Sequence, residues 1–363
     1  MKVLISGASV AGPALAYWLR HHGATPTVVE RAPAPRTSGQ AIDVRGAALT
    51  VVERMGLLEP LRAVRTRMRG SSMVDGDGTE LWRSTEYAPS SGRFDSPDLE
   101  VLREDLTGLL AERTAGVEYR YGDEITGLRQ DPDGVDVRFA GGGAERFDLV
   151  VGADGLHSEV RRRTFGDESQ FVRHLDTYLA VFSADNVLGL DNWQVWVRND
   201  TAGAGVYPAR DNTELRVNVG FRSALLRFDR RDLDAQRSLV AERAAGLGWE
   251  IPRLLKAMWQ APDFYFDAMA QVHLPTWSRG RVTLVGDAGY CPSPLSGQGT
   301  SLALVGAYVL AAELAAGDHV TALTRYEERM RPFVTRNQAL ATKNADGPAP
   351  EASMDGAKDA ISL

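Results

Sequence analysis

The chain has 363 residues, of which 44% are hydrophobic and 25% are charged, and its formal net charge is -7. This length exceeds the size at which a single core stops growing, and the apolar content is too high for disorder, so we expect a compact protein with two packed domains. The negative net charge argues against nucleic acid and anionic lipid as general partners, because both require a basic surface. Composition therefore favours chemistry on small molecules.

Cysteine content and the length of apolar runs indicate the cellular compartment of the protein. The single cysteine, Cys291, has no second cysteine with which to form an intrachain disulfide, and no charged segment followed by an apolar one precedes the first motif. No uninterrupted apolar run reaches about 18 residues, the length that spans a bilayer. We therefore expect a cytoplasmic protein without an integral membrane segment. The last stretch, residues 346–363, is rich in Ala, Gly, Pro and Asp, which predicts a flexible tail.

The first 30 residues predict a strand, a helix and a second strand. "KVLIS" and "TPTVVE" are short apolar strands, and "PALAYWLRHHG" between them has the pattern of a helix. In "LISGASVAG", Gly7 permits a tight turn and Gly12 permits close approach of helix and strand, while the helix N-terminus offers free N–H groups to a diphosphate. Ser9 stands where the middle glycine of this pattern belongs. We therefore expect its side chain to restrict the approach of the backbone to the phosphates and its hydroxyl to add a hydrogen-bond donor.

An acidic residue at the end of the second strand supports this interpretation. Glu30 lies at about the 20-residue spacing at which a carboxylate accepts hydrogen bonds from an adenosine ribose. The alternative interpretation is a plain strand-to-helix turn followed by a solvated glutamate.

Further strands are expected before residue 154. The segments "VEYRYG", "TGLRQ" and "GVDVRFA" alternate and predict a meander that leads into one more core strand. That strand runs into Asp154 and Gly155, which would then lie at the strand's carboxyl end, the edge where doubly wound sheets bind ligands. The alternative is that Asp154 or Ser158 only caps the following helix.

About 100 residues then break the nucleotide-domain pattern. "NWQVWVRN", "AGVYPA" and "ELRVNVGF" alternate, which predicts an antiparallel sheet with one packed face and one face available to line a pocket. Leu215, Val217 and Val219 share the packed face. Helical patterns in "RRDLDAQRSLVAERAAG" and "IPRLLKAMWQA" are expected to cover it. The candidates for the pocket face are Gln194, Trp196, Tyr207, Arg216 and Asn218, and ordinary exposure on a sheet is the alternative for each.

The most informative stretch is "RVTLVGDAGYCPSPLSGQGTSLA" at residues 281–303. An apolar strand leads through Gly286 to Asp287 and a loop rich in Gly, Pro and Ser, and a long apolar helix follows. An acidic group after a strand is suited to hold a ribityl hydroxyl, while Gly297 and Gly299 expose backbone donors at a helix start.

Other catalytic classes find no support. The six histidines show no compact ligand spacing, so no metal is expected. There is no GxSxG turn and no lysine placed as an obvious Schiff base, so the hydrolase and pyridoxal phosphate classes are disfavoured.

The three motifs, in this order and spacing, resemble the class A flavoprotein monooxygenases, the aromatic hydroxylase family that includes para-hydroxybenzoate hydroxylase and the tetracycline-inactivating monooxygenases. The resemblance extends to about residue 340. It implies that FAD is bound by a set of matching and neighbouring positions: Gly7, Ser9, Ala11, Gly12, Glu30, Arg31, Arg36, Asp43, Arg103, Asp154, Gly155, Gly286, Asp287, Pro294, Gly297, Gln298 and Gly299. Arg45 is nominated near the flavin ring and Arg36 for the pyridine nucleotide. The departures from the family pattern are Ser9, Tyr290 and Ser301.

The resemblance also implies fold and activity. The expected fold is α/β, with a Rossmann-like FAD-binding domain of the glutathione-reductase type, an inserted antiparallel-sheet substrate domain and a C-terminal helix. The expected segments are 1–70, 97–172 and 273–318 for the FAD-binding domain, 71–96 and 173–272 for the substrate domain, 319–345 for the helix and 346–363 for the tail.

In the implied reaction, NADPH or NADH reduces FAD, oxygen adds at C4a, and the hydroperoxide hydroxylates an electron-rich aromatic, polyketide or antibiotic-like small molecule. The chemistry is then centred on the flavin, with no single catalytic acid or base. The alternatives are a reductase or halogenase of the same fold and a non-enzymatic flavin-fold protein. The oligomeric state is expected to be a monomer or homodimer.

Overall fold

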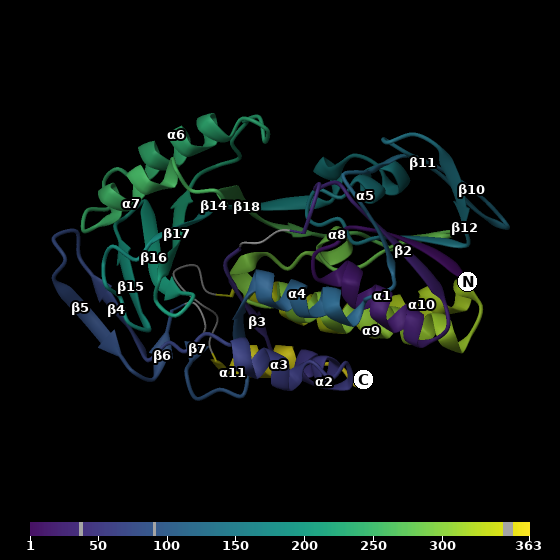
Figure 1. Ribbon diagram of the computed structural model, residues 1–363, viewed down its shortest axis with the longest axis horizontal. Coiled ribbons are helices and arrows are strands. Elements are labelled where there is room, and N and C mark those ends of the chain that lie inside the picture. The colour runs from purple at the N-terminus through teal and green to yellow at the C-terminus, as the bar shows by residue number, and fades with distance from the viewer. Residues whose placement is uncertain (36–38, 90–91, 344–350) are drawn as a thin grey trace.

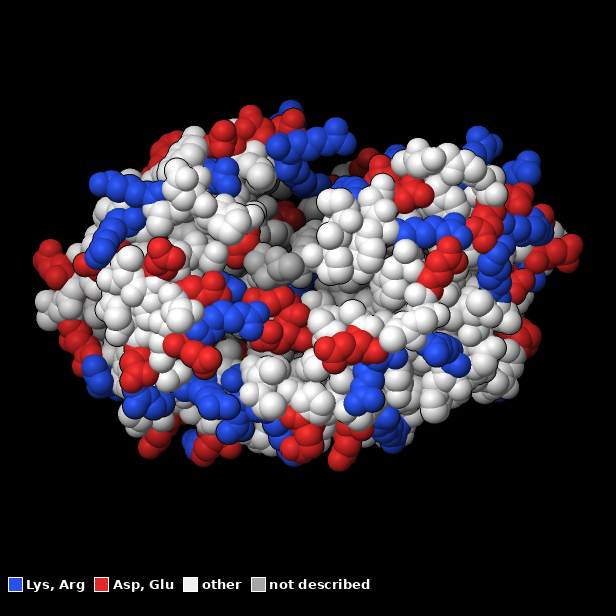
Figure 2. Space-filling view, in the orientation of Figure 1, with Lys and Arg blue, Asp and Glu red and all other residues white. Residues whose placement is uncertain are grey.

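The computed structural model describes residues 1–35, 39–89, 92–343 and 351–363 (Figure 1). The chain forms two lobes, one carrying α1, α9 and α10 and the other carrying α6 and α7. Strands β14 and β18 of the second lobe extend toward the first. On the face in Figure 2, acidic and basic side chains are interspersed, and the surface is hollowed between the lobes.

The first lobe is built on a six-stranded sheet in the order β19-β20-β13-β1-β2-β9. Its neighbours pair in parallel except β19 and β20. The central strands are continuous apolar runs because both faces of the sheet are covered. The strands are β1 (Lys2–Ser6), β2 (Thr25–Glu30), β9 (Glu118–Tyr121), β13 (Leu149–Gly152), β19 (Ser278–Arg279) and β20 (Val282–Leu284). The predicted nucleotide-binding sheet is therefore present, assembled from distant parts of the chain.

A three-stranded meander follows β9 in the chain but does not include it. It consists of β10 (Ile125–Asp131), β11 (Gly134–Phe139) and β12 (Ala144–Phe147). The prediction that "VEYRYG" belongs to this meander was wrong, because β9 pairs in parallel with β2. The residues of β9 are exposed or half-buried, which fits the edge of either sheet, so only the long-range pairing distinguishes the two positions.

Helices cover the parallel sheet. They are α1 (Ala11–His21), α2 (Ala47–Arg54), α3 (Leu58–Val64), α4 (Arg103–Arg113), α5 (Glu159–Phe165), α8 (Asp287–Tyr290), α9 (Gly299–Ala316) and α10 (His319–Leu340). By length and composition α9 is apolar enough to cross a membrane, but 61% of it is buried inside the protein. It packs against α1, α2 and α10, which explains its apolar surface as that of a core helix.

The second lobe contains a seven-stranded sheet in the order β18-β14-β17-β16-β15-β4-β5. Its strands are β4 (Gly70–Val74), β5 (Glu80–Ser84), β14 (Val172–Asp185), β15 (Trp193–Arg198), β16 (Ala202–Ala209), β17 (Glu214–Arg222) and β18 (Tyr265–Val272). The pairs are antiparallel as predicted, except that β4 and β15 are parallel. Leu215, Val217 and Val219 are fully buried in a core with α6 (Leu233–Ala244) and α7 (Ile251–Met258), which confirms the predicted packed face.

Short elements connect the lobes. Strands β3 (Ala41–Val44) and β8 (Leu99–Leu102) form an antiparallel pair, and β6 (Tyr87–Ala88) pairs with β7 (Gly92–Arg93). Two turns of 3-10 helix, η1 (Glu168–Gln170) and η2 (Pro294–Ser296), lie in loops.

The prediction of a flexible tail was wrong for residues 351–363. This segment contains α11 (Glu351–Lys358), and Ala357 is buried. Nζ of Lys358 lies 3.1 Å from a carboxylate oxygen of Asp98, and the Asn337 side chain donates to the carbonyl of Ala357. The polar composition of the segment concealed these few long-range contacts, which anchor it to α10 and the loop before β8.

Candidate functional site

A large cavity lies between the carboxyl edge of the parallel sheet and the second sheet. Its volume is about 2120 Å³. A pocket for one drug-sized ligand has at most about 1,000 Å³, so this space accommodates a dinucleotide together with a second molecule. The predicted cofactor residues that line it are Gly7, Ser9, Ala11, Glu30, Arg31, Asp43, Arg45, Arg103, Asp154, Gly155, Asp287, Pro294, Gly297, Gln298 and Gly299. Arg36 lies outside the described residues.

The first turn has the geometry that its glycines predict. Gly7 has a φ of +110°, and a Cβ at Gly12 would lie 1.9 Å from the carbonyl oxygen of Gly7. The carboxylate of Glu30 accepts hydrogen bonds from the backbone N–H of Ala8 at 2.9 Å and of Ala32 at 2.8 Å. Glu30 therefore closes the turn and also lines the cavity.

Ser9 is paired with Arg103. Nη2 of Arg103 donates to Oγ of Ser9 over 2.7 Å, and the backbone N–H of Arg103 donates to the carbonyl of Gln40. The residue that departs from the glycine pattern therefore orients a guanidinium at the N-terminal end of α1, where helix geometry favours anions.

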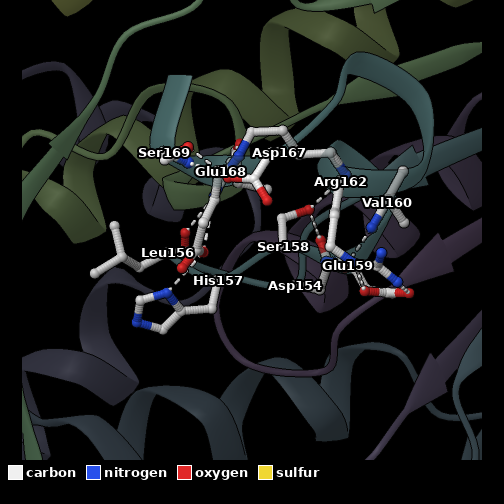
Figure 3. Close-up of polar contacts among 12 residues, drawn as sticks. Asp154, Leu156, His157, Ser158, Glu159, Val160, Arg162, Asp167, Glu168 and Ser169 are labelled. Atoms are coloured by element: carbon white, nitrogen blue, oxygen red, sulfur yellow. Dashed lines mark hydrogen bonds and ion pairs between the residues drawn. The ribbon is translucent and has the colours of Figure 1, made fainter. Parts of the chain in front are cut away.

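The Asp-Gly motif lies beside the start of α5 (Figure 3). The carboxylate of Asp154 accepts from the Ser158 hydroxyl and from the backbone N–H of Glu159 and Val160. Ser158 caps α5 by accepting from the backbone N–H of Arg161. Burial raises the pKa of Asp154 despite these donors. Ser158 and Asp154 therefore cap α5, as the alternative interpretation predicted. Asp154 and Gly155 also line the cavity.

The loop after β20 places a second buried carboxyl in the cavity. Gly286 has a φ of +64° and precedes Asp287. Burial raises the pKa of the Asp287 carboxyl, and the positive charge of Arg103 offsets only part of this rise. Gln298 is 0% exposed, yet neither polar atom of its side chain has a hydrogen-bond partner among the described residues. Such a buried amide fits a polar ligand group, since leaving it unpaired costs about 1–3 kcal/mol.

An ion pair lies at the cavity wall next to Gly297. Nη2 of Arg45 lies 2.8 Å from Oδ2 of Asp43, and both side chains are largely buried. Burial raises the pKa of Asp43, and the charge of Arg45 opposes that effect. Ser301 accepts from the backbone N–H of Arg45 at 3.0 Å. The departure at Ser301 therefore supports the backbone at Arg45, directly after β3.

The departure at Tyr290 lies in the core. Its hydroxyl lies 2.9 Å from that of Tyr326, which donates to the carbonyl of Leu284. A Cβ at Gly306 of α9 would lie 2.0 Å from the Tyr290 hydroxyl. Tyr290 therefore packs against both α9 and α10 and does not line the cavity.

Three of the five predicted pocket-face residues line the cavity: Trp196, Tyr207 and Asn218. Gln194 and Arg216 do not line it, and both are buried. Nε of Arg216 donates to the carbonyl of Gly39 at 2.9 Å, and its Nη2 donates to Glu104 of α4 at 2.8 Å. The side chain is long enough to cross the interface and bind the other lobe, which alternation along the strand does not reveal.

His157 is a cavity residue that we did not select from the sequence. Its Nδ1 lies 3.0 Å from Glu168 and its Nε2 lies 2.9 Å from Asp267. Burial lowers its pKa, but the hydrogen bonds with Asp267 and Glu168 outweigh burial and leave the pKa raised. Its position two residues after the Asp-Gly turn was the available signal.

The fold and the cavity define the class: a flavoprotein whose dinucleotide-binding lobe shares one space with a second sheet. The glycine turns, the acidic residues after strands and the unpaired Gln298 amide all suit FAD. Among the described residues, no three His, Cys, Asp or Glu side chains are grouped to hold a metal ion.

Comparisons with known proteins agree with the assignment to the flavoproteins. The family described as FAD binding domain matches residues 1–341. An uncharacterized protein of Mycobacterium tuberculosis is 54% identical over 351 residues, covering 96% of this chain and 94% of the relative. A flavin-dependent monooxygenase from an unknown prokaryotic organism is 42% identical over 340 residues, covering 93% and 88%. The crystal structure of the tetracycline destructase Tet(55) superposes with a TM-score of 0.90 at 39% identity, covering 100% of this chain and 98% of that one.

The chain belongs to the FAD-binding-domain family of flavoprotein monooxygenases. Its cofactor is FAD, and it is an FAD-dependent monooxygenase of the class A type.

Proposed function

We propose that this monooxygenase uses NADPH or NADH and oxygen to hydroxylate an electron-rich, fused-ring small molecule of the aromatic, polyketide or antibiotic type. One observation carries the proposal: the predicted FAD residues and the pocket-face residues Trp196, Tyr207 and Asn218 line a single cavity. The similarity to Tet(55), named as a tetracycline destructase, supports the substrate class.

The contribution of the chain's own residues would be to bind FAD and to orient it. FAD, when bound, supplies hydride acceptance and oxygen activation, and the route through flavin C4a stays a prediction. Arg103 and the N-terminus of α1 would bind the diphosphate, and Glu30 and Asp287 would accept hydrogen bonds from ribose and ribityl hydroxyls. Arg45, Asp43 and Gln298 would lie near the ring.

The position of the cavity is the second contribution of the protein. It lies between the two lobes, and exclusion of water by the bound cofactor and substrate would protect the reacting centre, because water there would divert reduced oxygen into hydrogen peroxide. No second dinucleotide-binding sheet is present among the described residues, so the nicotinamide is proposed to reach the flavin through the same cavity.

Two alternatives remain distinguishable. A halogenase of this fold would consume halide, and the sequence lacks the halogenase Trp-x-Trp-x-Ile-Pro stretch. A non-enzymatic flavin-fold protein would not consume NAD(P)H. Cytoplasmic location, the monomeric or homodimeric state and the division into the domain segments given above stay predictions.

The test uses purified protein loaded with FAD. NADPH and NADH oxidation is measured with tetracycline, with phenolic compounds and with polyketides, together with hydrogen peroxide release and product mass. We expect at least one fused-ring compound to stimulate oxidation and to gain one oxygen atom derived from labelled O2. Oxidation that yields only hydrogen peroxide with every compound, or no oxidation at all, would contradict the proposal.

A further inference from the structure

The cavity face of the seven-stranded sheet has an area without side chains. Its three glycines are Gly203 and Gly205 of β16 and Gly220 of β17, and all three line the cavity. Gly203 and Gly220 are direct cross-strand partners, and Gly205 lies between Trp196 on one side and Asn218 on the other. The three residues, here called the glycine floor, are therefore contiguous on one face of the sheet.

The fold does not require two of these glycines. A Cβ at Gly203 would lie 3.5 Å from its nearest neighbours, and a Cβ at Gly220 would lie 3.6 Å from the Tyr178 carbonyl, which are ordinary contact distances. Neither residue has a positive φ. Glycine inside a strand weakens it and often marks a place where a ligand approaches the backbone closely. Alanine would fit at both positions, so the missing side chains leave space in the cavity.

The third glycine shapes the floor through a neighbour. A Cβ at Gly205 would lie 2.5 Å from the ring of Trp196. The indole therefore lies against the strand at Gly205, where it lines the cavity. This arrangement continues the flat surface from the glycines onto an aromatic ring.

A polar atom without a partner borders this flat surface, since Asn218 is the cross-strand partner of Gly205. Oδ1 of Asn218 is buried and has no hydrogen-bond partner among the described residues. A buried acceptor is normally satisfied, so this oxygen indicates a hydrogen-bond donor on a ligand.

We propose that the glycine floor determines specificity by seating a flat fused-ring system face-on against the sheet. In that position a ring hydroxyl or amide N–H donates to Oδ1 of Asn218, and the Trp196 ring extends the contact area. The inference rests on the proposed function, because it assigns the second molecule in the cavity to this face. A side chain on the floor lifts a flat ligand away from these contacts.

The experiment compares FAD-loaded wild type with G203A, G220A and a matched control, G127A. Gly127 lies in β10, outside this cavity, where a Cβ would be 3.6 Å from the nearest atoms and φ is not positive. Calorimetric titration uses tetracycline and alizarin as fused-ring probes and catechol as a single-ring probe. Melting temperature and FAD retention are measured on the same samples.

We expect G203A and G220A to weaken binding of the fused-ring probes by about tenfold or more, since overpacking costs about 1–3 kcal/mol. Catechol binding, FAD retention and melting temperature should not fall, and G127A should match wild type throughout. Unchanged affinity for both fused-ring probes in both floor variants, or no binding of either probe by wild type, overturns the inference. Binding without NAD(P)H oxidation instead contradicts the proposed function and leaves the test of the floor valid.

Discussion

Nη2 of Arg103 donates to Oγ of Ser9 over 2.7 Å, so the residue that replaces a glycine in the first motif is bonded to the residue expected to contact FAD. The two lie 94 positions apart in the chain. The serine therefore narrows the turn and at the same time orients a positive charge toward the place where a diphosphate would bind. The hydrogen bond from Arg103 to Ser9 therefore compensates for the loss of the glycine in this motif.

Replacing Ser9 tests that pairing. Ser9→Ala removes the acceptor of Arg103, and loss of one such hydrogen bond, worth about 0.5–1.5 kcal/mol, should weaken FAD binding roughly twofold to tenfold. Titration of apo-protein by flavin fluorescence measures the effect. Ser9→Gly serves as the comparison, because it removes the same acceptor but widens the approach to the phosphates. Equal FAD affinity in wild type and Ser9→Ala would show that the pairing does not position the arginine.

Asp287 is the residue expected to hold the ribityl chain. Asp287→Ala removes an acceptor from a buried hydroxyl, so FAD affinity should fall about tenfold to a hundredfold. Asp287→Asn keeps the volume of the side chain, and its FAD affinity should lie between those of wild type and Asp287→Ala. The melting temperature of the apo-protein separates the alternatives: a lowered value with an unchanged FAD dissociation constant would mean that Asp287 only supports the turn.

Arg216 and Glu104 form a buried ion pair between the lobes, with side-chain exposures of 3% and 6%. Removing one partner of a buried pair costs about 3–5 kcal/mol, because the other charge stays buried. We expect Arg216→Gln to lower the melting temperature clearly. The control is Arg146→Gln, whose exposed pairs with Asp131 and Asp136 should contribute at most about 1 kcal/mol. Similar losses in both variants would contradict a role for Arg216 at the interface.

His157 makes stability depend on pH. Because its folded pKa is raised, its contribution is complete below the unfolded pKa of about 6.5 and is lost as pH rises through the folded value. Melting curves of wild type and His157→Gln between about pH 5 and 9 should therefore differ most at the acidic end and converge at the alkaline end. A difference that grows with pH would mean that the histidine is neutral between Glu168 and Asp267.

Much of the FAD-binding lobe was predictable because its signals are local. A turn that brings Gly12 within van der Waals distance of Gly7 excludes any side chain, so the requirement is written in consecutive residues. The same holds for Gly286 before Asp287, where a positive φ favours glycine. Alternation along β17 likewise predicted which residues face the core.

Pairings between distant segments were not predictable. Arg216 alternates like a pocket residue, but its length lets it bind Glu104 of α4, and no pattern in either segment specifies that partner. His157 acquires its two carboxylates from η1 and β18, which approach only when the lobes pack.

The sequence by itself determined most of the elements, the glycine turns of the three motifs and the family, because backbone sterics and hydrophobic periodicity act over a few residues. Tertiary structure alone decided that β9 joins the parallel sheet, that α11 packs on α10, and that the glycines of β16 and β17 meet as one floor. Each of these features depends on contacts between segments that are far apart in the chain. The free energy that stabilises such a contact depends on both segments together, so neither segment specifies it alone.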